Sequence, residues 1–126
     1  MLIVDGNNVI GSRPDGWWRD RAAAAARLAE AIGLWAQARA EQDVVVVFDG
    51  RRPAGFPAPP VIRIRFAERT GRDAADDVIA ALVAHADRPR NVTVVTSDSG
   101  LASRVRAHGA TVRGARGFRE LIEQNT

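Results

Sequence analysis

Three short apolar runs in this chain of 126 residues each lead into an aspartate. The runs and their acids are residues 2–4 with Asp5, residues 44–48 with Asp49, and residues 91–96 with Asp98. Runs of β-branched residues without polar alternation are typical of strands that are buried on both faces of a parallel sheet. Because the carboxyl ends of parallel strands lie along one edge of the sheet, we expect the three aspartates to converge there.

The segments between these runs have helical patterns. Residues 17–42 are rich in Ala, Leu and Arg and predict a long helix, with Trp18 and Trp35 on its apolar stripe. Three further helices are expected over residues 73–86, 101–108 and 118–124, an edge-like strand over 61–66 and a short last strand over 110–113. This alternation predicts an α/β fold with a mainly parallel central sheet flanked by helices, and the length suits a single domain over residues 1–126.

Composition excludes several kinds of site. The chain has no cysteine, which rules out a disulfide scaffold, a zinc finger and a thiol nucleophile, and only two histidines. A metal would therefore be held mainly by oxygen, which favours Mg²⁺ or Mn²⁺. All 18 basic residues are arginines against 15 acids, a weakly basic balance that is compatible with a nucleic-acid partner.

The chain also lacks the signals for several other protein classes. The turn after the first strand has no three-glycine phosphate loop, which argues against a dehydrogenase. Neither a signal peptide nor an apolar run of about 20 residues is present, so we expect a cytoplasmic protein without a membrane partner.

The acidic residues carry most of the functional information. Several carboxylates close together repel one another, and a bound divalent cation makes such a cluster tolerable. Each acid also has a plain structural interpretation: Asp5 and Asp49 suit turns, Asp98 suits a helix N-cap, and Asp73 suits an N-cap paired with Asp76 in a capping box. On the predicted helix Asp76 borders the buried face while its neighbour Asp77 points further away, so Asp76 is the better site candidate.

Three segments together resemble the NYN domains of the PIN-like nuclease superfamily, and most of all their YacP-type branch. The segments read LIVDGNNVI at 2–10, ADDVI at 75–79 and VVTSDSGL at 94–101. The resemblance covers nearly the whole chain. It implies a PIN-like Rossmannoid fold of three layers, and a metal-dependent ribonuclease that hydrolyses RNA phosphodiester bonds, as an endoribonuclease.

The same resemblance implies roles for individual residues. Asp5 would be the central ligand of Mg²⁺ or Mn²⁺, and Asp76, Asp77 and Asp98 would supply the remaining catalytic and metal-binding carboxylates. Asn8 would contact the substrate near the metal or the phosphate.

Residues beside the predicted acidic edge complete the candidate site. Asp49 would be a further ligand, because residues 48–50 resemble a related position in flap-type nucleases. Arg51 and Arg52 would bind phosphates of the substrate, and Trp17 would stack on a base. Three more arginines are expected near this edge: Arg69, Arg72 and Arg104.

Two other functions compete with the nuclease. The first is a non-catalytic RNA-binding module on the same fold. The second is a phosphatase with Asp5 as nucleophile, which fits less well because Asn7 stands where a second Asp is needed and the chain has no lysine. The sequence leaves open whether the target is the ribosome, a tRNA or an mRNA. It also leaves open a homodimer through the Ala-rich stripe of the first helix, which core burial explains equally well.

Overall fold

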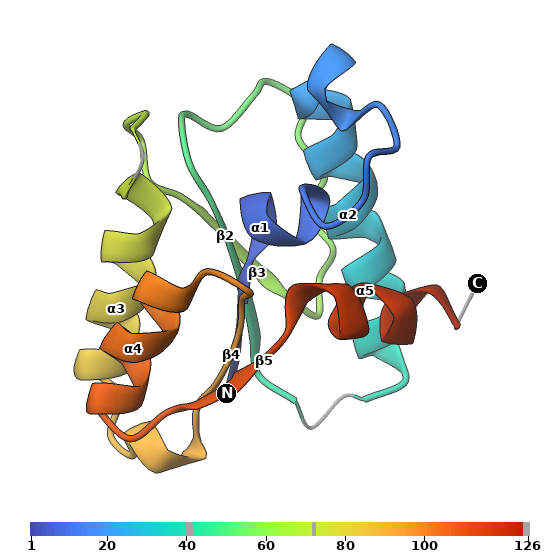
Figure 1. Ribbon diagram of the computed structural model, residues 1–126. Helices are drawn as coiled ribbons and strands as arrows, with labels where there is room; N and C mark the ends of the chain where they lie inside the picture. The colour runs from blue at the N-terminus through green and yellow to red at the C-terminus, as the bar shows by residue number, and fades with distance from the viewer. Residues whose placement is uncertain (40–41, 72, 125–126) are drawn as a thin grey trace.

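Five parallel strands form one sheet in the computed structural model, which describes residues 1–39, 42–71 and 73–124 (Figure 1). The strands are β1 (Leu2–Asp5), β2 (Val44–Phe48), β3 (Arg63–Phe66), β4 (Thr93–Val95) and β5 (Thr111–Arg113). Their order across the sheet is β3-β2-β1-β4-β5, and every neighbouring pair is parallel. The predicted parallel α/β sheet is thus confirmed, with β1 at its centre and β3 at one edge.

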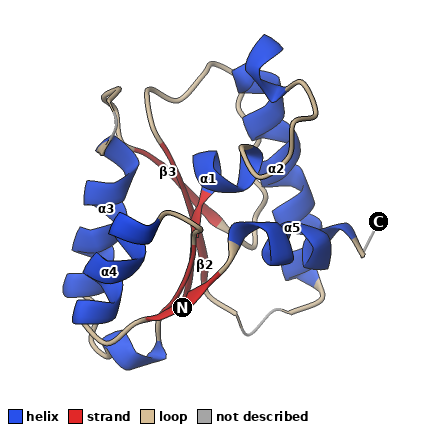
Figure 2. Ribbon diagram, viewed as in Figure 1, coloured by secondary structure: helices blue, strands red, loops and turns tan. Residues whose placement is uncertain are grey.

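Helices cover both faces of the sheet, so the fold has three layers (Figure 2). They are α1 (Gly6–Ile10), α2 (Arg21–Gln37), α3 (Ala74–Ala84), α4 (Ser99–Ala107) and α5 (Ala115–Glu123), with 3-10 turns η1 (Trp17–Arg19) and η2 (Pro89–Asn91). The helices α3 and α4 lie on one face, and α1, α2 and α5 lie on the other. Of the described residues, no helix is both long enough and apolar enough to cross a membrane.

Alternation along the central strands divides the core in two. Leu2 and Val4 of β1 pack with the helices α1, α2 and α5 on one face. Ile3 of the same strand packs with α3 and α4 on the opposite face, together with Val45 and Val47 of β2. Both strands are therefore buried on both faces, as their unbroken apolar runs predict.

The first long helix differs from its prediction at its start. It begins at Arg21, where the Asp20 side chain accepts a hydrogen bond from the backbone N–H of Ala23 at 3.0 Å. Trp17 and Trp18 belong to the preceding 3-10 turn, so the helical spacing of the apolar stripe of α2 does not extend to them. Trp18 is consequently 49% exposed, so the expectation that it packs in the core is wrong.

The other boundaries shift by small amounts. The helix α2 ends at Gln37 rather than near residue 42, and residues 40–41 lie outside the described residues. Asp73 occupies the N-cap position of α3, but its side chain makes no capping hydrogen bond, so the predicted capping box is wrong. Gly33 in the middle of α2 has a packing reason, because a Cβ there would lie 2.6 Å from Cβ of Pro59.

Candidate active site

Asp5 lies at the centre of the carboxyl edge of the sheet, because β1 runs between β2 and β4. It is 4% exposed, and its Oδ2 accepts a hydrogen bond from the Thr96 hydroxyl at 2.9 Å. Burial raises the pKa of Asp5 to about 6; the hydrogen bond from Thr96 lowers it, and the Asp76 and Asp98 carboxylates raise it further. The structure therefore brings three predicted site residues together around one buried carboxyl group.

Thr96 connects two of these acids, and sequence reasoning missed it. Its hydroxyl donates to Asp5 and accepts from the backbone N–H of Asp98 at 3.1 Å. Thr96 is 1% exposed, which makes it one of two buried polar residues among those described. The available signal was a hydroxyl side chain directly after the buried valines of β4, where packing alone would favour another apolar residue.

Asp98 is both a helix cap and a member of the acidic group. Its Oδ1 accepts a hydrogen bond from the backbone N–H of Leu101 at 2.9 Å, as the N-cap interpretation predicts. A Cβ at Gly100 would lie 3.2 Å from the same oxygen, so this position favours a residue without a side chain. The cap fixes the Asp98 carboxylate and leaves its second oxygen for other partners.

A hollow of about 460 Å³ lies beside these acids, and its walls include Asp73, Asp76, Asp98 and Arg104. Asp76 is half-buried on the first turn of α3. Burial raises the pKa of Asp76, and the carboxylates of Asp98 and Asp73 raise it further. We call this feature, with the adjacent buried Asp5, the acidic hollow.

The first turn of α1 ties the loops on both sides of Asp5. The Oδ1 atom of Asn7 accepts the backbone N–H of Asp49 at 2.9 Å, and the Oδ1 atom of Asn8 accepts the backbone N–H of Ser97 at 2.8 Å. The two consecutive asparagines thereby hold the ends of β2 and β4 against β1. Gly6 allows this approach, because a Cβ there would lie 2.4 Å from Cε1 of Phe48.

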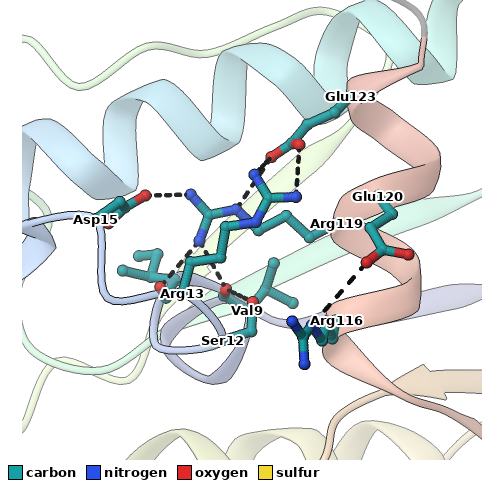
Figure 3. A network of polar contacts seen from close by, with 9 residues as sticks. Val9, Ser12, Arg13, Asp15, Arg116, Arg119, Glu120 and Glu123 are labelled. Carbon is teal, nitrogen blue, oxygen red and sulfur yellow. Dashed lines mark hydrogen bonds and ion pairs between the residues drawn. The ribbon is translucent and has the colours of Figure 1, made fainter.

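Arg119 of α5 anchors the other end of α1 (Figure 3). Its Nη1 donates to the carbonyl oxygens of Val9 and Ile10 at 3.3 and 3.1 Å, and its Nη2 pairs with Asp15 at 2.5 Å. The side chain is only 17% exposed, and its Nε also pairs with Glu123 at 3.3 Å. A five-residue helix is not stable alone, so this contact supports the element that carries both asparagines.

Asp77 lies on the same turn of α3 as Asp76 but has different partners. Its Oδ2 pairs with Arg69 at 2.6 Å and its Oδ1 pairs with Arg104 at 3.0 Å. The hydrogen bonds from Arg104 and then Arg69 lower the pKa of Asp77. The helical-wheel argument that separated the two aspartates thus agrees with their positions, and the ligand role of Asp77 stays a prediction.

The remaining predicted site residues are spread around this edge. Asp49 follows β2 and is exposed, as is Arg51. Arg52 donates from Nη2 to the carbonyl oxygen of Ile64 at 2.7 Å and lies 5.2 Å from the ring centre of Phe66, so it holds its own loop. Arg72 lies outside the described residues.

Trp17 lies on the opposite side of α1 from the acidic hollow. It is half-buried against the core that α2 and α5 share, and the guanidinium of Arg21 lies 5.4 Å from its ring centre. It also lines a cavity of about 220 Å³ with Arg119 and Asp15. Its predicted role in base stacking stays a prediction.

The donors around Asp5 suit a hard divalent cation. In the described part of the chain, no three acidic or histidine side chains come close enough to share one metal ion. Mg²⁺ usually binds through one or two carboxylates and keeps several waters, so it does not need a cage of three protein ligands. The buried Asp5, with Asp76 and Asp98 close enough to raise its pKa, fits such a site.

The strand order and the acidic edge define a parallel α/β protein whose candidate site lies at the carboxyl ends of its strands. A family profile described as "YacP-like NYN domain" matches residues 2–126, so the chain belongs to that family. Two crystal structures of Rae1 (YacP) from Bacillus subtilis, one of them a point mutant, share the fold with TM-scores of 0.75. They are 23% and 24% identical to this chain, over 98% and 99% of its length and 74% of theirs. No curated protein matches the chain.

Proposed function

We propose that this protein is a metal-dependent endoribonuclease that hydrolyses RNA phosphodiester bonds at Asp5, Asp76 and Asp98. The observation that carries the proposal is the buried Asp5 carboxyl, whose pKa is raised to about 6 by burial and by the two neighbouring acids. Leaving a carboxylate buried among other carboxylates costs stability, and no pairing arginine offsets that cost at Asp5 among the described residues. Membership of the nuclease-type family supports the same conclusion.

The chain's own residues would bind the cation and orient it. Asp5, with Asp76 and Asp98 beside it, would hold Mg²⁺ or Mn²⁺ together with several waters, and the family resemblance suggests Asp49 as a further ligand. A bound dication of this kind supplies an activated water and neutralises charge on the phosphate during in-line displacement. Thr96 orients the Asp5 carboxylate, and its contact with the Asp98 backbone keeps the two acids in register.

Cleavage of end-labelled RNA tests the proposal directly. The panel would contain single-stranded RNA, tRNA and ribosome-bound mRNA, each with Mg²⁺, Mn²⁺ or EDTA. We expect the wild-type protein to cleave with either metal, and Asp5→Asn and Asp98→Asn to lose at least about 100-fold in rate, since even indirect partners of a metal are often worth 10–100-fold. Asp98→Asn keeps the N-cap of α4, because Asn is as good an N-cap residue as Asp.

A matched control separates this effect from general changes in charge. Asp43→Asn also removes one carboxylate, from an exposed ion pair with Arg63 just before β2, at the opposite edge of the sheet. We expect it to cleave as the wild type does. Equal cleavage by all four proteins would overturn the proposal. Tight RNA binding without metal-dependent cleavage would instead select a non-catalytic RNA-binding module.

A further inference from the structure

Two arginines from different elements meet at Asp77, next to the acidic hollow. Arg104 of α4 forms part of its wall, and its charge lowers the pKa of Asp76. Arg69 comes from the loop after β3, where its carbonyl oxygen accepts the backbone N–H of Gly50 at 2.9 Å. Its loop is therefore fixed beside the end of β2, and its side chain extends from there towards α3.

Asp77 holds both guanidinium groups at once. Its Oδ2 is 2.6 Å from Nη2 of Arg69, and its Oδ1 is 3.0 Å from Nη1 of Arg104. The two arginine side chains are 56% and 47% exposed. Within the described part of the chain each of these guanidiniums makes a single hydrogen bond, so most of their N–H donors face solvent.

We propose that Asp77 is a positioning residue that holds Arg69 and Arg104 at the rim of the acidic hollow, where they bind RNA phosphates on either side of the scissile bond. This inference rests on the proposed function and assigns the substrate contacts of the same site. Planar guanidiniums suit phosphate oxygens, and fixing two flexible side chains before binding lowers the entropy lost when RNA binds.

The proposal gives Asp77 a different role from that of its neighbour Asp76. Each oxygen of Asp77 already accepts from an arginine, so a cation on either oxygen would lie beside a positively charged guanidinium that repels it. Asp76 has no such pair among the described residues: Arg104 lowers its pKa only through its charge, and burial and the other acids raise it. Two adjacent aspartates would thus serve the cation and the substrate separately.

Steady-state cleavage and RNA binding test the assignment, with binding measured by fluorescence anisotropy in EDTA at several salt concentrations. We expect Asp77→Asn to raise KM about 3- to 10-fold with kcat and the Mg²⁺ requirement unchanged. Removing a negative charge would by itself tighten RNA binding, so a higher KM is opposite in sign to the bulk electrostatic effect. Asp43→Asn, which breaks one exposed pair of 2.7 Å far from the hollow, is the matched control and should not raise KM.

Arginine variants complete the test. Replacing both Arg69 and Arg104 with Gln should raise KM about tenfold. The slope of the logarithm of the RNA-binding constant against the logarithm of the salt concentration should become shallower by about 1.4, the value for two phosphate contacts on a single strand. Adding Asp77→Asn to that double variant should raise KM no further, because the residue acts only through the two arginines. If Asp77 were a metal ligand, Asp77→Asn would instead lower kcat and raise the Mg²⁺ requirement, both in the wild type and in the double arginine variant.

The failures are distinguishable. If the wild type cleaves RNA but Asp77→Asn has an unchanged or lower KM, the inference is overturned while the proposed function stands. If Asp77→Asn loses kcat and needs more metal, Asp77 is a ligand and the inference is also overturned. If the wild type neither binds nor cleaves any RNA of the panel, both the inference and the proposed function fall.

Discussion

The acids at the two ends of the short helix α1 differ in their surroundings. At its N-terminal end Asp5 is buried beside two other carboxylates, and burial raises its pKa to about 6. At its C-terminal end Asp15 and Glu123 both pair with Arg119, and Arg13 also pairs with Glu123 at 2.7 Å. There burial raises the pKa of Asp15, but the hydrogen bond and the charge of Arg119, together with backbone hydrogen bonds, lower it on balance.

The difference separates structural from functional acids in this chain. The acids that pair with Arg119 stabilise the fold by holding α5 against the segment around α1. An acid that stays unpaired in a buried position destabilises the fold, so its presence indicates a ligand that is bound in the working protein. The two groups of acids lie at the two ends of the same helix. At one end Asn7 and Asn8 hold the loops beside Asp5, and at the other Arg119 donates to the carbonyl oxygens of α1.

Asp5→Asn should produce the largest change in stability. Because the folded pKa of Asp5 is about 6 against an ordinary value of 3.8, the folded protein binds this proton more tightly than the unfolded chain. The stabilisation from protonated Asp5 is therefore complete below pH 3.8 and is lost as the pH rises through about 6. A shift of this size corresponds to about 3 kcal/mol, so in EDTA the Asn variant should be more stable than the wild type by up to that amount at pH 7.5 and about equal at pH 3.5.

Urea unfolding at a series of pH values measures this difference. Addition of Mn²⁺ at pH 7.5 should raise the midpoint of the wild type and leave that of Asp5→Asn unchanged, since the cation needs the charged carboxylate. This metal effect is independent of any RNA assay. A wild type that is already as stable as the Asn variant at pH 7.5 without metal would contradict the contrast between the two ends of α1.

Arg119→Met should have the next largest effect, in the opposite direction. The variant keeps most of the buried aliphatic stem but leaves two helix carbonyls and the partly buried Glu123 without this donor. We expect a loss of about 2 kcal/mol in the free energy of unfolding, which is in the range for breaking a partly buried hydrogen-bond network.

Arg116→Met provides the control on the same helix. Arg116 is 80% exposed and its nitrogen lies 4.0 Å from Glu120, so the loss should stay below about 0.5 kcal/mol. Since Arg119 also fixes the end of α1, Arg119→Met should lower kcat for RNA cleavage, whereas Arg116→Met should not. Equal losses of stability in the two variants would show that the network around Arg119 contributes no more than a surface ion pair.

The sequence predicted those parts of the molecule that depend on local pattern. The runs that form β1 and β2 are apolar throughout, which requires burial on both faces, and a parallel sheet then places Asp5 and Asp49 at one edge. The helical wheel also separated Asp76 from Asp77 from local pattern alone, because the period of an α-helix is fixed.

Features that depend on contacts between distant segments could not be predicted. The start of α2 is a local feature that the sequence did carry, in the N-cap residue Asp20, but the apolar pattern that extends back to Trp18 favoured an earlier start. By contrast, the contact of Thr96 with Asp5 spans 91 positions, and those of Arg119 with α1 span about 110. No spacing rule connects such residues, so the positioning contacts of the site emerge only from the folded chain.

Thr96→Val should have the smallest of these effects on stability and a specific effect on titration. The substitution nearly preserves shape but removes the hydroxyl that lowers the pKa of Asp5 and accepts the Asp98 backbone N–H. We expect a loss of about 1 kcal/mol at pH 7.5 in EDTA, typical for one buried hydrogen bond. The pH at which stability stops falling should also move above that of the wild type, because the pKa of Asp5 rises further.

Thr93→Val, at the other end of β4, makes the same chemical change on a half-buried residue and should leave this pH unchanged. An unshifted pH profile in Thr96→Val would mean that burial alone sets the ionisation of Asp5, and that the hydroxyl serves only to hold the Asp98 loop.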